Sequence, residues 1–423
     1  MSLSLSVFLS IGYTNYSYKI FIEDQPQLTL FAKLSFERAV WHPDKDAHHD
    51  LQRTVNEFDL TERFSKIKPD CIASPLVLWD VEHDDQKMKL LVTVWSKADE
   101  QFANQFIDGS IDPRIAQPLA NALAALHSID NYDPSFNEQI KPFMDTQFKH
   151  LKDAIQEKAR TTSSEPPQDR VEKICAMIGE DTLMKILDDN HKDFYSGDCL
   201  IHSDSHTFNI LVEAKPDEND LNLFGSKGEL TLCDWEMAMI GPQGRDAGLV
   251  IAWPLACKVS HALCGHVESN ENIQIRLFVH TFLTSYFSEI AADKTEEELA
   301  KIYRQCIGWC GWFMLVAFWL FDAFLGDAPG CEMNSHREYV RESMGVLGLK
   351  LMRLSYDKEY VPEKTKLNEL TVLFNMLVDE EVTQAYANSP TRPVQRRSSL
   401  LRSSNRRISD AATCLGPDTF LAQ

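Results

Sequence analysis

The segment CLIHSDSHTFNILVE, residues 199–213, carries polar side chains at a spacing that suits phosphate transfer. His202, Asp204 and Asn209 lie between two apolar runs that predict strands. A hydroxyl that attacks a phosphate needs a carboxylate to orient it and accept its proton, a role that fits Asp204. An amide five residues later can reach back to that carboxylate or to a metal ion. His202 is either a core histidine or part of the chemistry, whereas His206 has no role that the pattern predicts.

A second acidic motif, LTLCDWEMAMIGPQGRDAG, occupies residues 230–248. Asp234 ends an apolar run 30 residues after Asp204, and Glu236 follows two residues later. Residues i and i+2 of an extended segment share a face, so we expect both carboxylates to hold Mg²⁺. Asp246, twelve residues after Asp234, is expected to brace the catalytic loop.

Two upstream residues complete a nucleotide-binding arrangement. Lys33 lies in the alternating run LFAKLSF, and Glu57 lies 24 residues later in a segment with helical spacing. A Lys on a third strand that pairs with a Glu on the next helix positions the α- and β-phosphates of a nucleotide. The alternatives are an ordinary strand lysine and, on the same helix, Asp59 or Glu62 in place of Glu57. The order of these parts along the chain is more specific than either acidic motif alone.

Hydropathy patterns predict an α+β protein with a small, mostly β lobe followed by a larger, mostly helical lobe. Residues 3–34 alternate as strands, and a helix and a further hairpin carry the pattern to Trp95. Helical spacing then dominates, apart from the strands that flank the two acidic motifs. We expect a nucleotide-binding lobe over residues 1–95, a catalytic and substrate lobe over 96–388, and a disordered basic tail over 389–423.

Composition excludes several classes of protein. The net charge of −21 argues against a nucleic-acid binder, which needs a positive field. Ten Cys without zinc-like spacing indicate free thiols in a reducing compartment, so we expect a cytoplasmic protein. The longest run of apolar residues, 306–321, has 16 residues, fewer than the roughly 20 that span a bilayer. A buried helix is therefore expected there, with no membrane span.

These motifs resemble the small-molecule kinases of the protein-kinase-like fold: aminoglycoside phosphotransferases, choline and ethanolamine kinases, and methylthioribose kinases. The likeness runs from about residue 12 to residue 354. IHSDSHTFNILV and CDWEMAMIGPQGRDAG are most similar to the H-G-D-L-H-T and D-P-E-F-A-F-Y-G-P-M-G-F-D-I-G segments of methylthioribose kinases. The resemblance implies a two-lobed fold, ATP and Mg²⁺ as cofactors, and transfer of the γ-phosphate to a small-molecule alcohol or sugar.

The resemblance also implies a role for each motif residue. Asp204 is implied as the catalytic base, supported by His202 in the catalytic loop. The implied metal ligands are Asp234 and Glu236. The spacing argument above adds Asn209, which replaces the small polar residue usual in methylthioribose kinases and is closer to the aminoglycoside and choline kinases. The nucleotide is expected to contact the GYTNYS turn, the Lys–Glu pair and a hinge over residues 92–96. The residues concerned are Gly12, Thr14, Asn15, Lys33, Glu57 and Val94.

One departure from methylthioribose kinases leaves the acceptor open. Those enzymes hold their sugar with an Arg pair, whereas the nearest stretch here, GWFMLVAFW at residues 311–319, contains no Arg. Choline, ethanolamine and aminoglycosides are therefore alternative acceptors. The aromatic residues of this region either fill the core of the lobe or form a cation–π cage for a quaternary ammonium; they are Trp309, Trp312, Phe313, Phe318 and Trp319.

Two other functions stay open at this level. A catalytically inactive kinase fold that acts as a binding module is one, although no chemistry-bearing residue is missing from the sequence. A protein kinase is less favoured, because no A-P-E segment follows the Asp234 motif. The tail sequences RRSSL and RRIS place Ser after an Arg pair, which is typical of phosphorylation sites. The oligomeric state is not indicated.

Overall fold

The computed structural model describes the chain from residue 3 to residue 389 with gaps. The described residues are 3–11, 15–22, 25–37, 50–83, 86–96, 98, 100–130, 140–157, 168–213, 230–265, 269–320 and 324–389. The predicted basic tail therefore lies outside the described residues, apart from Ser389.

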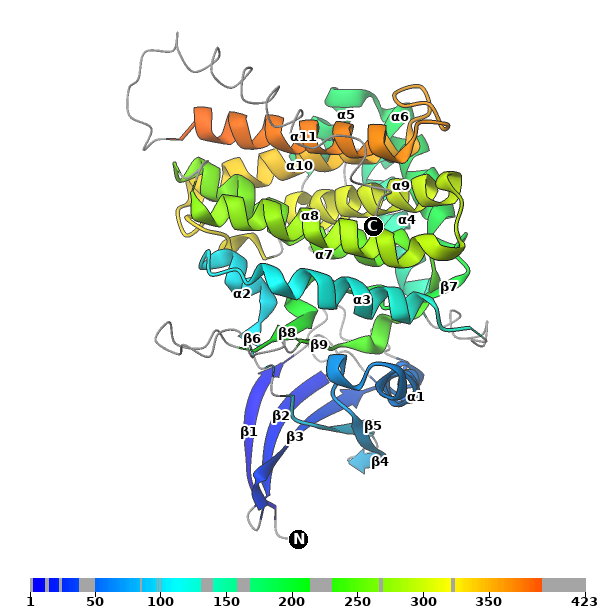
Figure 1. The fold of residues 1–423 in the computed structure, drawn as a ribbon, viewed down its shortest axis with the longest axis vertical. Coiled ribbons are helices and arrows are strands. Elements are labelled where there is room, and N and C mark those ends of the chain that lie inside the picture. Colours follow the sequence, from blue (N-terminus) through cyan, green and yellow to red (C-terminus); the bar gives the residue numbers. More distant parts are fainter. Residues whose placement is uncertain are drawn as a thin grey trace.

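The smaller part of the molecule is a five-stranded antiparallel sheet with one helix beside it (Figure 1). The strands run in the order β1-β2-β3-β5-β4. Their bounds are β1 Leu3–Ile11, β2 Asn15–Ile22, β3 Gln25–Phe36, β4 Pro75–His83 and β5 Gln86–Val94, and the helix is α1 Gln52–Ile67. The predicted strands, helix and hairpin are all confirmed.

Lys33 lies in the middle of this sheet. Strand β3 pairs with β2 on one side and with β5 on the other, which places Lys33 opposite Ser17 and Leu91. Central strands are fixed by hydrogen bonds on both edges, so this position holds the lysine backbone firmly.

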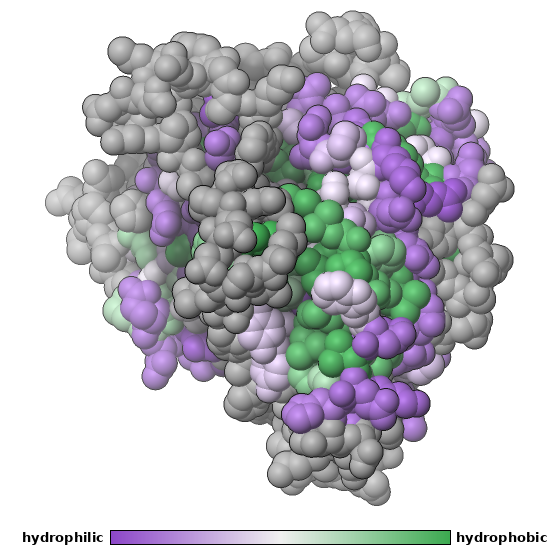
Figure 2. Space-filling view, turned by 90° about the horizontal axis from the view of Figure 1, so that it is seen from below, coloured by the Kyte–Doolittle hydropathy of each residue, from purple (hydrophilic) through white to green (hydrophobic). Residues whose placement is uncertain are grey.

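Figure 2 views the molecule from the sheet end and shows hydrophobic residues gathered over a continuous part of the described surface.

The larger part is helical and lies on the other side of a layer of short strands (Figure 1). These strands are β6 Glu100–Gln101, β7 Cys199–Ile201, β8 Ile210–Val212, β9 Leu230–Leu232 and β10 Met239–Gly241. The helices are α2 Phe102–Ile107, α3 Ala116–His127, α4 Lys141–Glu157, α5 Gln168–Ile178, α6 Glu180–Phe194, α7 Gly244–Leu263, α8 Asn270–Ile290, α9 Glu296–Phe313, α10 Asn334–Tyr356 and α11 Leu367–Ala387. The predicted α+β fold with a small sheet lobe and a larger helical lobe is confirmed.

Helix α7 is the centre of the helical lobe, because every one of its residues is buried. A helix that is apolar on all sides needs neighbours on all sides. Two glycines let α9 approach closely: a Cβ at Gly244 would lie 2.4 Å from the carbonyl oxygen of Ile302, and one at Gly248 would lie 2.4 Å from that of Cys306. The start of α9 is fixed by a capping box between Thr295 and Glu298.

The long aromatic run forms the end of α9 and a π-helical segment, Met314–Leu320. Its tryptophans Trp309, Trp312 and Trp319 are buried, as is Phe318. The prediction of a buried helix is thus confirmed, and these side chains do not form an open cage for a cation.

In the described part of the chain, no helix combines the length and apolarity needed to cross a membrane. The nine described cysteines are free thiols.

Candidate active site

The loop after β7 is held in place by one buried carboxylate, that of Asp246 at the start of α7. Its Oδ2 accepts a hydrogen bond from the backbone N–H of His202 at 2.8 Å, and its Oδ1 accepts one from that of Ser203 at 2.8 Å. Ser203 has a φ of 67°, in the left-handed region that is uncommon for residues other than glycine. The predicted bracing role of Asp246 is therefore confirmed, and the bracing fixes the direction of the next residue, Asp204.

A histidine that the sequence did not single out supports this brace. His127, on α3, places its Nε2 3.0 Å from Asp246 Oδ2 and its Nδ1 2.7 Å from the hydroxyl of Tyr286. Burial alone would raise the pKa of Asp246, but the hydrogen bonds from His127 and the backbone hold that pKa below its ordinary value. The carboxylate is thus charged and fully bonded inside the core.

Asp246→Asn is expected to lower the free energy of unfolding by about 2–3 kcal/mol at neutral pH. The amide offers one acceptor oxygen in place of two, so one buried N–H loses its partner. Because the folded pKa is depressed, the stabilisation is present above the ordinary value of 3.8 and is lost as pH falls through the lower folded pKa. Urea unfolding should show a gap between wild type and variant that narrows below about pH 4. Asp59→Asn, at an exposed site on α1, serves as control; equal stability at neutral pH would contradict the role.

His202 joins the loop after β7 to the second acidic motif. Its side chain is buried, and its Nε2 lies 3.0 Å from the backbone carbonyl of Cys233. Burial lowers the pKa of His202, which favours the neutral imidazole. Of the two interpretations that the sequence left open, this geometry favours the structural one, in which His202 positions Asp204 and Asp234 relative to each other.

Asp204 and Asn209 are in direct contact, as their five-residue spacing predicts. Asn209 Nδ2 donates to the backbone carbonyl of Asp204 at 2.9 Å and to its carboxylate Oδ2 at 3.0 Å. A short helical turn, Thr207–Asn209, curls the chain back to make this contact. The Asp204 side chain remains about a third exposed, so its carboxylate is open to a ligand.

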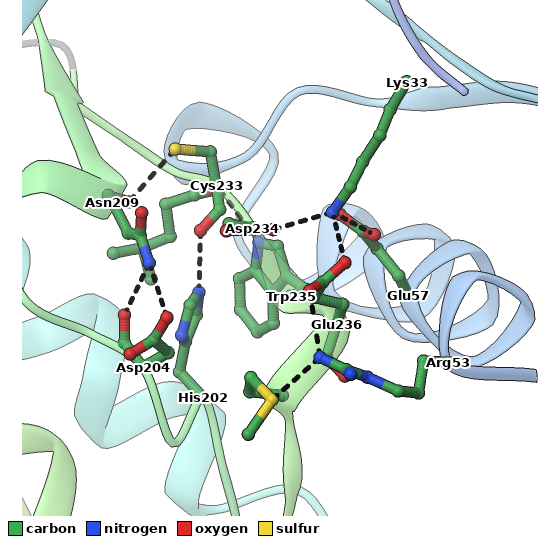
Figure 3. A network of polar contacts seen from close by, with 12 residues as sticks. Lys33, Arg53, Glu57, His202, Asp204, Asn209, Cys233, Asp234, Trp235 and Glu236 are labelled. Carbon is green, nitrogen blue, oxygen red and sulfur yellow. Dashed lines mark hydrogen bonds and ion pairs between the residues drawn. The ribbon is translucent and has the colours of Figure 1, made fainter. Parts of the chain in front are cut away.

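Lys33 is the centre of a second cluster, shown in Figure 3. Its Nζ lies 2.7 Å from Asp234 Oδ1, 2.9 Å from Glu236 Oε2 and 3.0 Å from Glu57 Oε2. The predicted pairing of Lys33 with Glu57 is confirmed. The contacts with Asp234 and Glu236 extend it, since the lysine of the sheet lobe reaches both acids of the second motif.

The charges of this cluster stabilise the protonated form of Lys33 at its centre. Burial alone would lower the pKa of Lys33, but Asp234, Glu236 and Glu57 together raise it well above its ordinary value. Burial raises the pKa of Glu57 to about 7, against the opposing effect of Lys33. A carboxylate held this far from water gains from any further positive charge that enters the site.

Arg53 is a functional-site residue that sequence reasoning missed. It lies one turn before Glu57 on α1 and reaches Glu236, with its Nη2 2.9 Å from Oε1 and its Nε 3.3 Å from the backbone carbonyl. Arg53 thus contacts Glu236 directly, whereas Glu57, one turn later on the same face of α1, is connected to Glu236 through Lys33. The i, i+4 spacing of Arg53 and Glu57 was the signal available, but it did not reveal a partner 183 residues away.

The donor set of this cluster fits Mg²⁺. Oxygen atoms of Glu57, Asp234 and Glu236 all lie within 4.8 Å of one another. With Glu57 ionised, the three carboxylates and the two cations Lys33 and Arg53 leave one net negative charge. Mg²⁺ is held in proteins by one or two carboxylates together with substrate phosphates. Asp234, with a φ of 62°, keeps 40% of its side chain exposed, so its carboxylate is accessible to an ion.

The remaining residues predicted to contact a nucleotide are only partly described. Gly12 and Thr14 lie outside the described residues, so that part of the prediction stays a prediction. Asn15 is the first residue of β2 and is nearly buried. Val94 ends β5, where its backbone N–H donates to the carbonyl of Ser74 at 3.0 Å. Beside it, the ammonium of Lys19 lies 3.8 Å from the centroid of the Trp95 ring.

Solved structures that match this chain include an ethanolamine kinase and aminoglycoside phosphotransferases. Ethanolamine kinase from Plasmodium vivax is 11% identical, with a TM-score of 0.41, over 90% of this chain and 83% of that one. The ADP-bound aminoglycoside phosphotransferase APH(2'')-Ib is 14% identical, with a TM-score of 0.37, over 91% of this chain and 95% of that one. A mutant of the aminoglycoside phosphotransferase APH(4)-Ia, in complex with ADP and hygromycin B, is 12% identical, with a TM-score of 0.38, over 81% and 94%.

Comparison of the sequence with family models assigns the chain to a family. Among curated proteins, none matches the chain. The profile described as "Phosphotransferase enzyme family" matches residues 7–258, more than half of the chain. This range contains β2 to β5, the catalytic loop and the second acidic motif, so the match covers both clusters described above. The chain belongs to the phosphotransferase enzyme family.

Proposed function

We propose that this protein is a kinase that transfers the γ-phosphate of ATP to a hydroxyl of a small molecule. The observation that carries the proposal is the meeting of Lys33 with Glu57, Asp234 and Glu236, opposite the loop that presents Asp204. These are the parts that phosphoryl transfer requires, a cationic clamp and a carboxylate base, on the elements where such enzymes carry them.

Each residue of the chain has a defined task in this proposal. Lys33, held by Glu57, binds the phosphates of the nucleotide. Asp234, Glu236 and Asn209, through its amide oxygen, would hold Mg²⁺, which when bound neutralises charge on the transferring phosphate. Asp204 orients the acceptor hydroxyl and takes its proton, and Asn209 and Asp246 hold Asp204 in position.

The division of labour between the lobes belongs to the same proposal. Residues 1–95 bind the nucleotide, residues 96–388 carry the catalytic loop and the acceptor site, and residues 389–423 form the tail. The free thiols support a reducing compartment such as the cytoplasm. Methylthioribose, choline, ethanolamine and aminoglycosides remain the acceptors that the sequence suggests, and a direct assay must choose among them.

Nucleotide binding is expected to require Mg²⁺ and Asp234. A nonhydrolysable ATP analogue at about one hundred times its Kd should stabilise the protein by about 2.7 kcal/mol when Mg²⁺ is present. Thermal unfolding with and without Mg²⁺ measures this effect. Asp234→Asn should lose most of it, whereas Asp59→Asn should keep it. A full shift without Mg²⁺, or in Asp234→Asn, would show that the acidic cluster does not bind the metal–nucleotide complex.

A further inference from the structure

An aromatic cluster borders Asp204. It consists of His206, Phe208, Phe313 and Phe324. His206 Nε2 lies 3.5 Å from Asp204 Oδ1, and the His206 ring lies 5.6 Å from the Phe313 ring and 5.6 Å from the Phe324 ring, centroid to centroid. The rings of Phe208 and Phe324 stack at 4.4 Å with an angle of 22° between their planes. Three separate segments of the chain thus converge on the proposed base.

Buried rings pack against the cluster, whose phenylalanines are themselves partly exposed. Behind Phe208 lies the buried ring of Trp253 at 5.0 Å, and behind Phe313 lies that of Phe318 at 5.2 Å. Phe208 and Phe313 are partly exposed, and Phe324 is 36% exposed. Buried second-row rings hold the front rings in place without covering them.

Phe324 holds its position against a conformational cost. Its φ of 63° lies in the left-handed region, where a bulky side chain is an outlier. Such a conformation costs about 1–3 kcal/mol and persists where the surroundings fix it, most often at ligand sites. Despite this cost, the partly exposed ring of Phe324 stays stacked on the ring of Phe208.

One of the two ring nitrogens of His206 has no partner among the described residues. The residue is 7% exposed, and its Nε2 faces Asp204 and Asn209 Nδ2, which lies 3.4 Å away. Its other ring nitrogen, Nδ1, is buried and has no hydrogen-bond partner among the described residues. A buried polar atom without a partner is unfavourable, and a polar atom of a bound acceptor would satisfy it.

The chemistry of these four side chains selects the acceptor. Phenylalanine offers no hydrogen bond, so His206 is the one group of the cluster that can pair with a polar atom. A sugar exposes hydroxyls all round and needs several such groups. A quaternary ammonium needs ring faces on several sides, whereas Phe208 and Phe324 are already stacked on each other. A flat apolar body can extend this stack.

We infer that the acceptor is an alcohol whose hydroxyl is carried on a flat apolar body, which stacks on the aromatic cluster while the hydroxyl meets Asp204. His206 acts as a specificity-determining residue that hydrogen-bonds a second polar atom of acceptors that carry one. This inference rests on the proposed kinase function, but it concerns the acceptor alone.

The test compares acceptors matched in size. We would measure kcat/KM for phenylethanol against cyclohexylethanol, for choline against its neutral dimethylbutanol analogue, and for methylthioribose. Phenylethanol should exceed cyclohexylethanol by about fivefold to tenfold, and choline should show no advantage over its neutral analogue. Phe324→Leu and Phe313→Leu, which stay apolar but lose the ring, should each reduce the preference for phenylethanol. Trp79→Leu, an exposed aromatic on β4, should leave it unchanged.

Two results would overturn the inference while leaving the kinase function intact. One is a higher kcat/KM for choline or methylthioribose than for phenylethanol. The other is an unchanged preference in both Phe variants, with their folding verified by thermal unfolding. Calorimetry separates the two proposals: if phenylethanol binds and its affinity falls in Phe324→Leu, yet no acceptor yields ADP, the aromatic site stands and the kinase function is wrong.

Discussion

Replacing Asp204 by Asn is expected to slow phosphate transfer by about 10²–10⁴-fold, the contribution of a positioned general base. The amide keeps the shape of the side chain, and its oxygen can still accept the hydrogen bond from Asn209 Nδ2. It cannot accept the proton of the acceptor hydroxyl. The loss should therefore appear in kcat, because the nucleotide is bound by other residues, and ADP release under saturating ATP measures it.

The control for this variant is a carboxylate of the same type outside the site. Asp70→Asn, at an exposed position after α1, should keep full turnover. Calorimetry of the Asp204→Asn protein should show ATP binding close to that of the wild type. Turnover near the wild-type rate in Asp204→Asn would show that another group takes the proton, and the assignment of the base would be wrong.

Lys33→Met is expected to have the largest effect on stability. The substitution removes the ammonium that contacts Glu57, Asp234 and Glu236, and leaves Glu57 buried beside two like charges. Breaking a buried ion pair by removing one partner costs about 3–5 kcal/mol. Urea unfolding without nucleotide should show a loss of this size, and phosphate transfer should fall with it because the phosphates lose their clamp.

Lys258→Met is the matched control for Lys33→Met. Lys258 is also nearly buried, but its partner Asp379, at 3.1 Å, is more than half exposed and stays solvated without it. The loss of stability should therefore be clearly smaller. In the double variant Lys33→Met with Glu57→Gln, removal of the stranded charge should restore part of the stability. A Lys33→Met protein as stable as the wild type would contradict the account of the cluster.

The parts of the site that are local in sequence were predictable. The strand that carries Lys33 and the helix that carries Glu57 both follow from periodicity, and their 24-residue separation matched a known pairing. The contact of Asn209 with Asp204 follows from five-residue spacing, and the brace by Asp246 from its distance along the second motif. The contact of Asn209 with Asp204 is set within one loop, whereas the Lys33–Glu57 pairing and the brace by Asp246 were predictable because the order of the parts along the chain matched a known arrangement.

The parts that depend on how distant elements pack were not predictable. Arg53 reaches Glu236 only because α1 lies across the second acidic motif, and no spacing along the chain encodes that crossing. His127 supports Asp246 from α3, 119 residues away. The aromatic cluster was missed for the same reason, since Phe313 and Phe324 lie more than a hundred residues after His206.

Periodicity also has a limit of length. The sequence predicted two strands around the acidic motifs, whereas the structure has four, β7 to β10, of three residues each. Alternation needs four or more residues to be distinguished from chance. The aromatic run was correctly predicted as buried, but its change from α-helix to π-helix at Met314 depends on packing that the sequence pattern does not contain.

The proposed transfer of phosphate from ATP to an alcohol can be followed with a labelled γ-phosphate. Purified protein would be incubated with Mg²⁺, γ-labelled ATP and each acceptor: phenylethanol, choline, ethanolamine, an aminoglycoside and methylthioribose. Label is expected to move to one acceptor in step with ADP release, and Asp204→Asn should slow both by about 10²–10⁴-fold. Bound ATP with no labelled product from any acceptor would contradict the proposed transfer and would favour an inactive kinase fold that serves as a binding module.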